Sequence, residues 1–140
     1  MDLDLKEPFA TPTVIGAPVG KYSHLAATPP GHRLVQIAGQ VGTLPDGSLA
    51  GPDVTTQTRQ IFANIEALLG TLGVGPRELV KLTTFVSGRS CLPGFLTARD
   101  EVYDRWYPDG VYPAHSLAVV EGLALPELAV EIEGIAAVPE

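Results

Sequence analysis

Two stretches near the end of the chain, YPAHSLAVV at residues 112–120 and VEIEGIA at residues 130–136, decide the fold of this sequence. Both have the extended, apolar character of strands. Because side chains alternate between the two faces of a strand, Glu131 and Glu133 point one way and Ile132 points the other. Acidic side chains on an otherwise apolar strand are costly unless water, a partner or a ligand meets them. With a single histidine at the start of the other strand, this region is where we expect the chemistry.

Upstream of these strands, the hydrophobic periodicity predicts the remaining elements. Residues 53–72 predict a helix, because apolar residues recur three or four positions apart. A second helix is predicted over residues 93–106, and a strand over residues 79–87. Residues 22–27 and 34–39 predict two further strands joined by a Pro-Pro-Gly turn, which favours a hairpin between them.

This order of elements predicts one α+β domain that spans residues 1–140, with an irregular, proline-containing lead-in over residues 1–19. Two helices packed on one face of a sheet make a two-layer architecture. The predicted strands carry apolar residues on both faces, for example Val35 against Leu34, and Leu117 against Ala118. The helices can cover one face only, so we expect a second copy of the chain to cover the other.

The composition excludes several classes of function. The net charge is −7 and the nine basic residues are scattered, whereas a nucleic-acid surface needs clustered Lys and Arg. Cys91 is the only cysteine, so neither an intramolecular disulfide nor a cysteine-based metal site is expected. The sequence also contains no phosphate-binding loop, no spaced metal ligands and no serine triad. We therefore expect no cofactor and no metal.

Neither a targeting signal nor a membrane segment is expected. The first seven residues, MDLDLKE, lack the apolar run of a signal peptide. No stretch approaches the roughly 18–20 apolar residues that span a bilayer. A cytoplasmic protein without a membrane partner is the expectation.

At this point the chain resembles the reactive intermediate deaminase family, also called the Rid or YjgF family. The resemblance extends from Gly20 to Ala136 and depends on the order and spacing of several short motifs. Besides the two stretches quoted above, these motifs are GKYS at 20–23, QIAGQVG at 36–42, the helix around 57–67, VKLTTFV at 80–86 and DEVY at 100–103.

The resemblance implies a chorismate-mutase-like (YjgF-like) α+β fold, with two helices on one face of a mainly antiparallel sheet. It also implies a homotrimer with three equivalent clefts between subunits. Family members of the founding type hydrolyse reactive enamines and imines to ketones and ammonia. Pyridoxal-phosphate-dependent dehydratases that act on serine or threonine release such intermediates, so the expected partner is a small-molecule substrate.

Two departures from the family pattern concern the substrate. In deaminase-competent members, an arginine after the Pro-Ala pair binds the substrate carboxylate, and here that position is His115. Arginine offers a permanently charged planar fork, whereas a histidine with an ordinary pKa of about 6.5 is mostly neutral at pH 7 and offers one donor. Asp100 stands where the family commonly has an asparagine. We therefore expect 2-imino acids to bind poorly.

The resemblance also implies roles for individual residues. Glu131 matches the carboxylate that positions the attacking water, although an acid paired across a subunit interface is an alternative. His115 has three open interpretations: a general acid or base, a neutral hydrogen-bonding group, or a residue without a remaining role. The implied substrate-binding residues are Tyr22, Ser23, Gly39, Asp100 and Ala114.

Three functions follow as hypotheses. The first is a Rid-type hydrolase with an altered substrate preference, in which Glu131 and His115 are the catalytic residues that add water to a C=N or C=C–N bond. The second is a trimer that binds or senses a small molecule without catalysis. The third is RNA cleavage, a name often attached to the family, which the negative charge disfavours.

Overall fold

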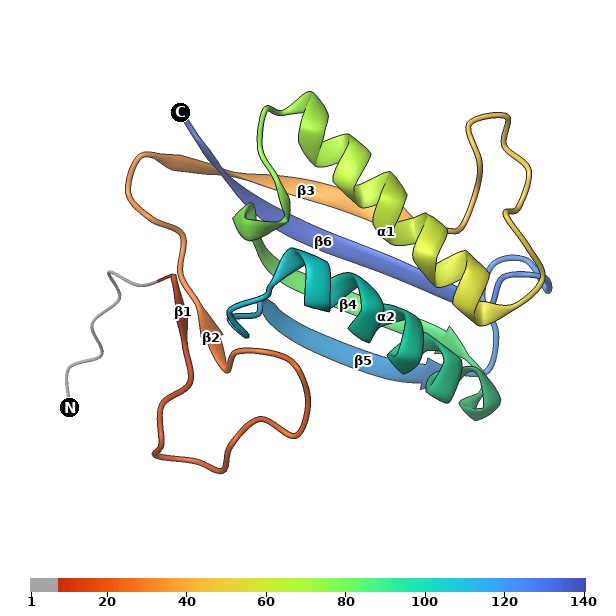
Figure 1. Ribbon diagram of the computed structural model, residues 1–140, viewed down its shortest axis with the longest axis horizontal. Helices are drawn as coiled ribbons and strands as arrows, with labels where there is room; N and C mark the ends of the chain where they lie inside the picture. Colours follow the sequence, from red (N-terminus) through yellow and green to blue (C-terminus); the bar gives the residue numbers. More distant parts are fainter. Residues whose placement is uncertain (1–7) are drawn as a thin grey trace.

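The main sheet has four strands in the order β3-β6-β4-β5 (Figure 1). The structure, a computed structural model, describes residues 8–140. The strands are β3 (His32–Gln40), β6 (Val130–Pro139), β4 (Leu79–Ser87) and β5 (Ala114–Val120). β6 pairs antiparallel with both β3 and β4, whereas β4 and β5 are parallel. The parallel pair follows from the connection between β4 and β5, which crosses over through a helix.

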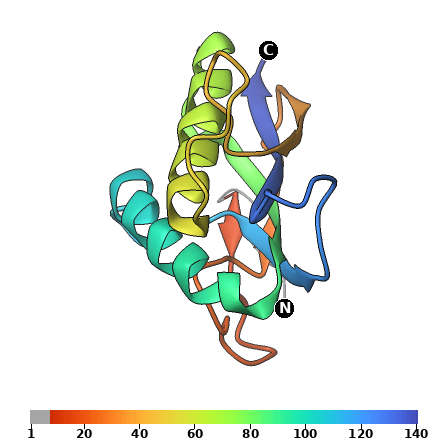
Figure 2. The same cartoon turned by 90° about the vertical axis from the view of Figure 1, so that its right-hand side faces the viewer.

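Two helices, α1 (Val54–Thr71) and α2 (Leu92–Trp106), lie side by side on one face of this sheet (Figure 2). Asp53 caps α1 by accepting a hydrogen bond from the backbone N–H of Thr56 at 2.9 Å. Gly73, with φ of 72°, follows the last turn of α1 in the left-handed conformation that glycine favours. None of the helices in residues 8–140 combines the length and apolarity that crossing a membrane requires. The predicted two-layer α+β fold is confirmed.

The core fills the space between the helices and the sheet. The periodic apolar positions of both helices face inward, as the sequence predicts, and each fully buried large side chain contributes about 1.5–3 kcal/mol of burial free energy. The buried side chains include Ile61, Phe62, Ile65 and Leu69 of α1, Phe95, Val102, Tyr103 and Trp106 of α2, and Leu79, Leu82, Val86, Val130 and Ile132 of the sheet.

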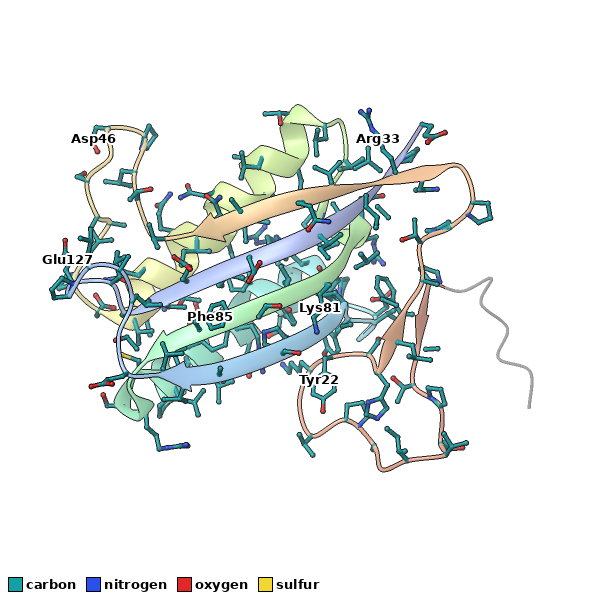
Figure 3. The ribbon with its side chains drawn as sticks, turned by 180° about the vertical axis from the view of Figure 1, so that it is seen from behind. Tyr22, Arg33, Asp46, Lys81, Phe85 and Glu127 are labelled. Carbon is teal, nitrogen blue, oxygen red and sulfur yellow. The ribbon has the colours of Figure 1, made fainter. Side chains whose placement is uncertain are left out.

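The opposite face of the sheet carries no helix (Figure 3). On β4, Lys81 and Phe85 lie on this open face and are half-buried, while Leu82 and Val86 point into the core. Leu34 at the edge of the sheet is 53% exposed. The face is therefore a mixture of apolar and polar side chains, and its coverage by a second copy stays a prediction.

The predicted hairpin between residues 22–27 and 34–39 is wrong. β2 (Leu25–Ala26) pairs instead with β1 (Phe9–Ala10), and the two form a separate small sheet. β3 takes the C-terminal strand β6 as its antiparallel partner along nearly its whole length, which offers many more backbone hydrogen bonds than the short β2 could. The predicted lead-in therefore contains a strand at Phe9–Ala10, and its first seven residues lie outside the described part of the chain.

Candidate functional site

His115 lies near the start of β5 on the face that the helices cover. It is level with the core residue Leu82 of β4, and parallel neighbours point to the same side of a sheet. Its Nε2 atom forms a hydrogen bond with the hydroxyl of Thr84 at 2.9 Å. His115 is thus held against the core side of the sheet rather than on the open face.

The surroundings of His115 disfavour its charged form. Burial, the nearby guanidinium of Arg99 and the ammonium of Lys81 lower the pKa of His115 to about 4. The imidazole is therefore neutral at pH 7. Among the three interpretations of this residue, its environment supports the neutral hydrogen-bonding group.

This shift predicts a pH-dependent stability. In the unfolded chain the histidine takes up a proton below about pH 6.5, whereas the folded protein resists this until about pH 4, so acidification favours unfolding. The free energy of unfolding therefore contains a contribution from neutral His115 of about 3 kcal/mol, which is fully present above pH 6.5 and is lost as the pH falls to 4. His115→Gln should flatten the fall in the free energy of unfolding between pH 7 and 4, measured by urea denaturation. Equal slopes for both proteins would show that the imidazole keeps an ordinary pKa.

A buried arginine on α2 lies at the end of the sheet where β5 begins, because Tyr103, which its guanidinium covers, stacks on Tyr112. The side chain of Arg99 on α2 is 9% exposed, and its guanidinium lies over the rings of Phe95 and Tyr103, at 6.0 and 5.6 Å from their centroids. Its Nε and Nη2 atoms donate hydrogen bonds to one oxygen of Asp100 at 3.2 and 3.0 Å. The spacing of Arg99 from Phe95 and Tyr103 puts the three on one face of α2, but the position of Arg99 near the start of β5 depends on long-range packing.

The segment around Tyr22 is tied to the residues just before β5. The hydroxyl of Ser23 donates to the carbonyl of Tyr112 at 2.6 Å, and its N–H donates to the carbonyl of Pro113 at 3.2 Å. Lys21 reaches Asp100 with an Nζ–Oδ1 distance of 3.5 Å. Figure 3 shows the labelled Tyr22 beside the start of β5.

Most of the predicted binding residues therefore gather at one end of the sheet. This first group, which we call the β5 group, consists of Tyr22, Ser23, Asp100, Ala114 and His115, together with Arg99. The hydroxyl of Ser23 is already bonded to the backbone carbonyl of Tyr112, which is a structural role. Its contact with a ligand stays a prediction.

Glu131 and Gly39 form a second group on the neighbouring strands β6 and β3. A Cβ atom added to Gly39 would lie 2.9 Å from both Cδ and Oε2 of Glu131, so the glycine backbone runs directly against the carboxylate. Glu131 is level with Phe85 of β4 and shares the open face with it. The sequence named both residues but gave no reason to make them neighbours.

The two groups do not meet within one chain. His115 is level with Leu82, and Glu131 is level with Phe85, three residues further along β4 and two strands away from β5. At the usual strand spacings this is about 10 Å along and about 10 Å across the sheet. The side chains also lie on opposite faces. A single site that uses both residues therefore needs a second copy of the chain.

Gly39→Ala tests the contact with Glu131. The added methyl group meets the far end of a flexible side chain, which can move aside, so we expect a stability loss of less than about 1 kcal/mol. If the position of the carboxylate matters for turnover, activity should fall at least about tenfold. Urea denaturation and steady-state kinetics on the same preparation separate the two effects. A variant that is fully active would make the contact incidental.

Two other features of residues 8–140 bear on the location of the site. No three His, Cys, Asp or Glu side chains within residues 8–140 are arranged to hold a metal ion. A surface hollow of about 410 Å³ is lined by residues that include Glu66, Arg77 and Trp106. Neither His115 nor Glu131 lines that hollow, so it is not the site that the strand motifs indicate.

Known proteins share both this sequence pattern and this fold. The family model described as Endoribonuclease L-PSP matches residues 14–138. A RutC family protein from Pyrococcus horikoshii is 32% identical over 121 residues, which are 85% of this chain and 88% of that protein. A Salmonella typhimurium protein named 2-iminobutanoate/2-iminopropanoate deaminase is 31% identical over 106 residues, 74% of this chain and 78% of its own length.

Among solved structures, YyfB from Yersinia pestis is described as a protein of unknown function of the conserved Rid protein family. It superposes with a TM-score of 0.80 at 31% identity, over 93% of this chain and 97% of its own. Fold and sequence together thus define a chorismate-mutase-like α+β protein of the YjgF type. The chain belongs to the Rid (YjgF) family.

Proposed function

We propose that this protein is a hydrolase of the Rid type that acts on a reactive enamine, an imine or a related small metabolite. The observation that carries the proposal is the carboxylate of Glu131, held on the open face of the sheet against the backbone of Gly39. A relative named as a 2-iminobutanoate/2-iminopropanoate deaminase supports the class of chemistry.

The proposed reaction is the addition of water to a carbon–nitrogen double bond. Glu131 orients the water and accepts its proton as the oxygen attacks the imine carbon. The imine nitrogen takes up a proton as the carbon–oxygen bond forms, which gives a carbinolamine. The nitrogen then takes up a second proton, the hydroxyl gives up its proton, and the carbon–nitrogen bond breaks to leave a ketone and ammonia. An enamine enters the same route once it has taken up a proton at carbon to become an imine.

His115 changes the substrate preference in this proposal. A neutral imidazole donates one hydrogen bond and carries no charge, so it replaces neither the charge nor the two parallel bonds of an arginine fork. With Nε2 already engaged by Thr84, the imidazole retains Nδ1 for a ligand. We propose that it orients a substrate by hydrogen bonding.

We further propose that the site is a cleft between subunits of a homotrimer. Two features of the chain support this arrangement. The sheet has an uncovered face that includes apolar side chains such as Phe85 and Leu34. The β5 group and Glu131 also lie too far apart within one chain to act on one small molecule.

A trimer that binds or senses a small molecule without catalysis is the second candidate. It is favoured by the protein partners that side chains of the β5 group already have: Ser23 bonds the backbone of Tyr112, His115 bonds Thr84, and Arg99 bonds Asp100. A ligand that raises the melting temperature without being converted would support this candidate over the hydrolase.

Ammonia release distinguishes the two candidates. Enamines generated in place from amino-acid precursors, with and without a carboxylate, are supplied to the protein, and ammonia and ketone are measured against spontaneous hydrolysis. The hydrolase proposal expects acceleration with at least one of these substrates. Rates equal to the spontaneous ones for both would rule it out.

A further inference from the structure

Arg99 is the only charged side chain that is buried in residues 8–140. Removing an ion from water costs several kcal/mol unless partners compensate for it. Nε and Nη2 both donate to the same Asp100 oxygen, whereas no described residue accepts a hydrogen bond from Nη1, which is not among the fully buried unpartnered atoms and so remains available to water or a ligand. The flanking rings of Phe95 and Tyr103 add attraction but accept no strong hydrogen bond.

A second cation lies beside the Arg99–Asp100 pair in a chain whose net charge is −7. The ammonium of Lys21 is 3.5 Å from the same Asp100 oxygen and 4.0 Å from Asp104, whereas Lys81 projects from the opposite, open face of the sheet and bonds Ser116. An anion that binds beside Arg99 would therefore meet the guanidinium with a second cation close by.

Asp100 is placed so that it can release the guanidinium. It is the more exposed partner, with 42% of its side chain accessible against 9% for Arg99. The same oxygen that accepts from Arg99 is near the ammonium of Lys21. When an external anion binds the guanidinium, Asp100 keeps a cationic partner in Lys21, so the exchange leaves no charge unpaired.

We infer that Arg99 is the specificity-determining residue that binds the anionic group of the ligand, and that the ligand is a small imine or enamine that bears a carboxylate. This inference rests on the proposed function, because it assigns a group within the same site. It moves recognition of the carboxylate from strand β5, where His115 stands, to helix α2. It predicts the opposite of the expectation, drawn from His115 and Asp100, that 2-imino acids bind poorly.

Binding of a stable ketone tests the inference without turnover. Pyruvate and its uncharged match pyruvamide are titrated calorimetrically into the wild-type protein and into Arg99→Met. We expect the wild-type protein to prefer pyruvate, and Arg99→Met to bind pyruvate at least about tenfold more weakly with little change for pyruvamide. Arg105→Met, which removes an equal charge from an exposed position of the same helix, should bind like the wild type.

Two further variants keep the test decisive if Arg99→Met does not fold. Asp100→Asn frees the guanidinium and should tighten pyruvate binding, whereas Arg99→Lys keeps the charge without the fork and should weaken it. The inference is overturned if the wild-type protein does not prefer pyruvate to pyruvamide, or if the Arg99 and Asp100 variants all bind pyruvate like the wild type. Intact Arg99-dependent binding without ammonia release would overturn the proposed hydrolysis alone.

Discussion

Glu131→Gln is expected to lower kcat for ammonia release by at least about 100-fold. Glutamine has nearly the same shape as glutamate but cannot accept the proton of the attacking water at neutral pH. Because the change removes a group that acts on the water rather than on the substrate, KM should change little. Steady-state kinetics with an enamine generated in place measures both constants.

Glu133→Gln is the matched control for this substitution. Glu133 projects from the same face of β6 two residues further on, and it is exposed. The Glu133→Gln substitution changes the net charge of the chain by the same amount as Glu131→Gln, so both variants share any electrostatic effect on the open face. We expect the control to retain near wild-type activity. An active Glu131→Gln protein would remove Glu131 from the chemistry.

Gln57→Leu is expected to reduce the free energy of unfolding by about 3 kcal/mol. Gln57 on α1 is fully buried, and its amide bonds three backbone groups across the end of the sheet. It donates to the carbonyls of Gly51 and Glu127 at 3.0 and 3.1 Å and accepts from the N–H of Ala129 at 2.8 Å. Leucine fills a similar volume but leaves these three groups unpaired.

Urea denaturation at pH 7 measures this loss, with Gln60→Leu as the control. Gln60 lies one turn further along α1 and bonds the side chain of Asn64, so its replacement should cost less than about 1 kcal/mol. Since Ala129 lies two residues before Glu131, the Gln57 variant should also disturb the start of β6. A Gln57→Leu protein as stable as the control would show that water replaces these bonds.

The helices and the central strand could be predicted closely from the sequence. The expected helix over 53–72 is α1 (Val54–Thr71), and the expected strand over 79–87 is β4 (Leu79–Ser87). These elements show their periodicity within a single segment. The pairing of strands cannot be found in a single segment. β3 and β6 are about a hundred residues apart in the sequence, and nothing local distinguishes β6 from β2 as the partner of β3.

The candidate site was predictable in its parts but not in its arrangement. Alternation along β6 correctly separates Glu131 from Ile132, yet only the packed structure shows that the helices cover the Ile132 side. The same packing places His115 on that covered side, opposite to Glu131. Helical spacing alone groups Arg99 with Phe95 and Tyr103, but its position beside the segment that leads into β5 depends on how Tyr103 of α2 packs against Tyr112.

Mixed oligomers test most directly the central claim that one site is built from two copies of the chain. Glu131→Gln and Arg99→Met subunits, each expected to be nearly inactive on a carboxylate-bearing enamine, are co-expressed with different tags, and the hetero-oligomers are isolated. If each cleft takes Glu131 from one copy and Arg99 from its neighbour, each isolated hetero-trimer has one restored cleft in three, so we expect about one third of the wild-type activity. Hetero-oligomers no more active than the two parent variants, or a wild-type protein that is monomeric in solution, would contradict the claim.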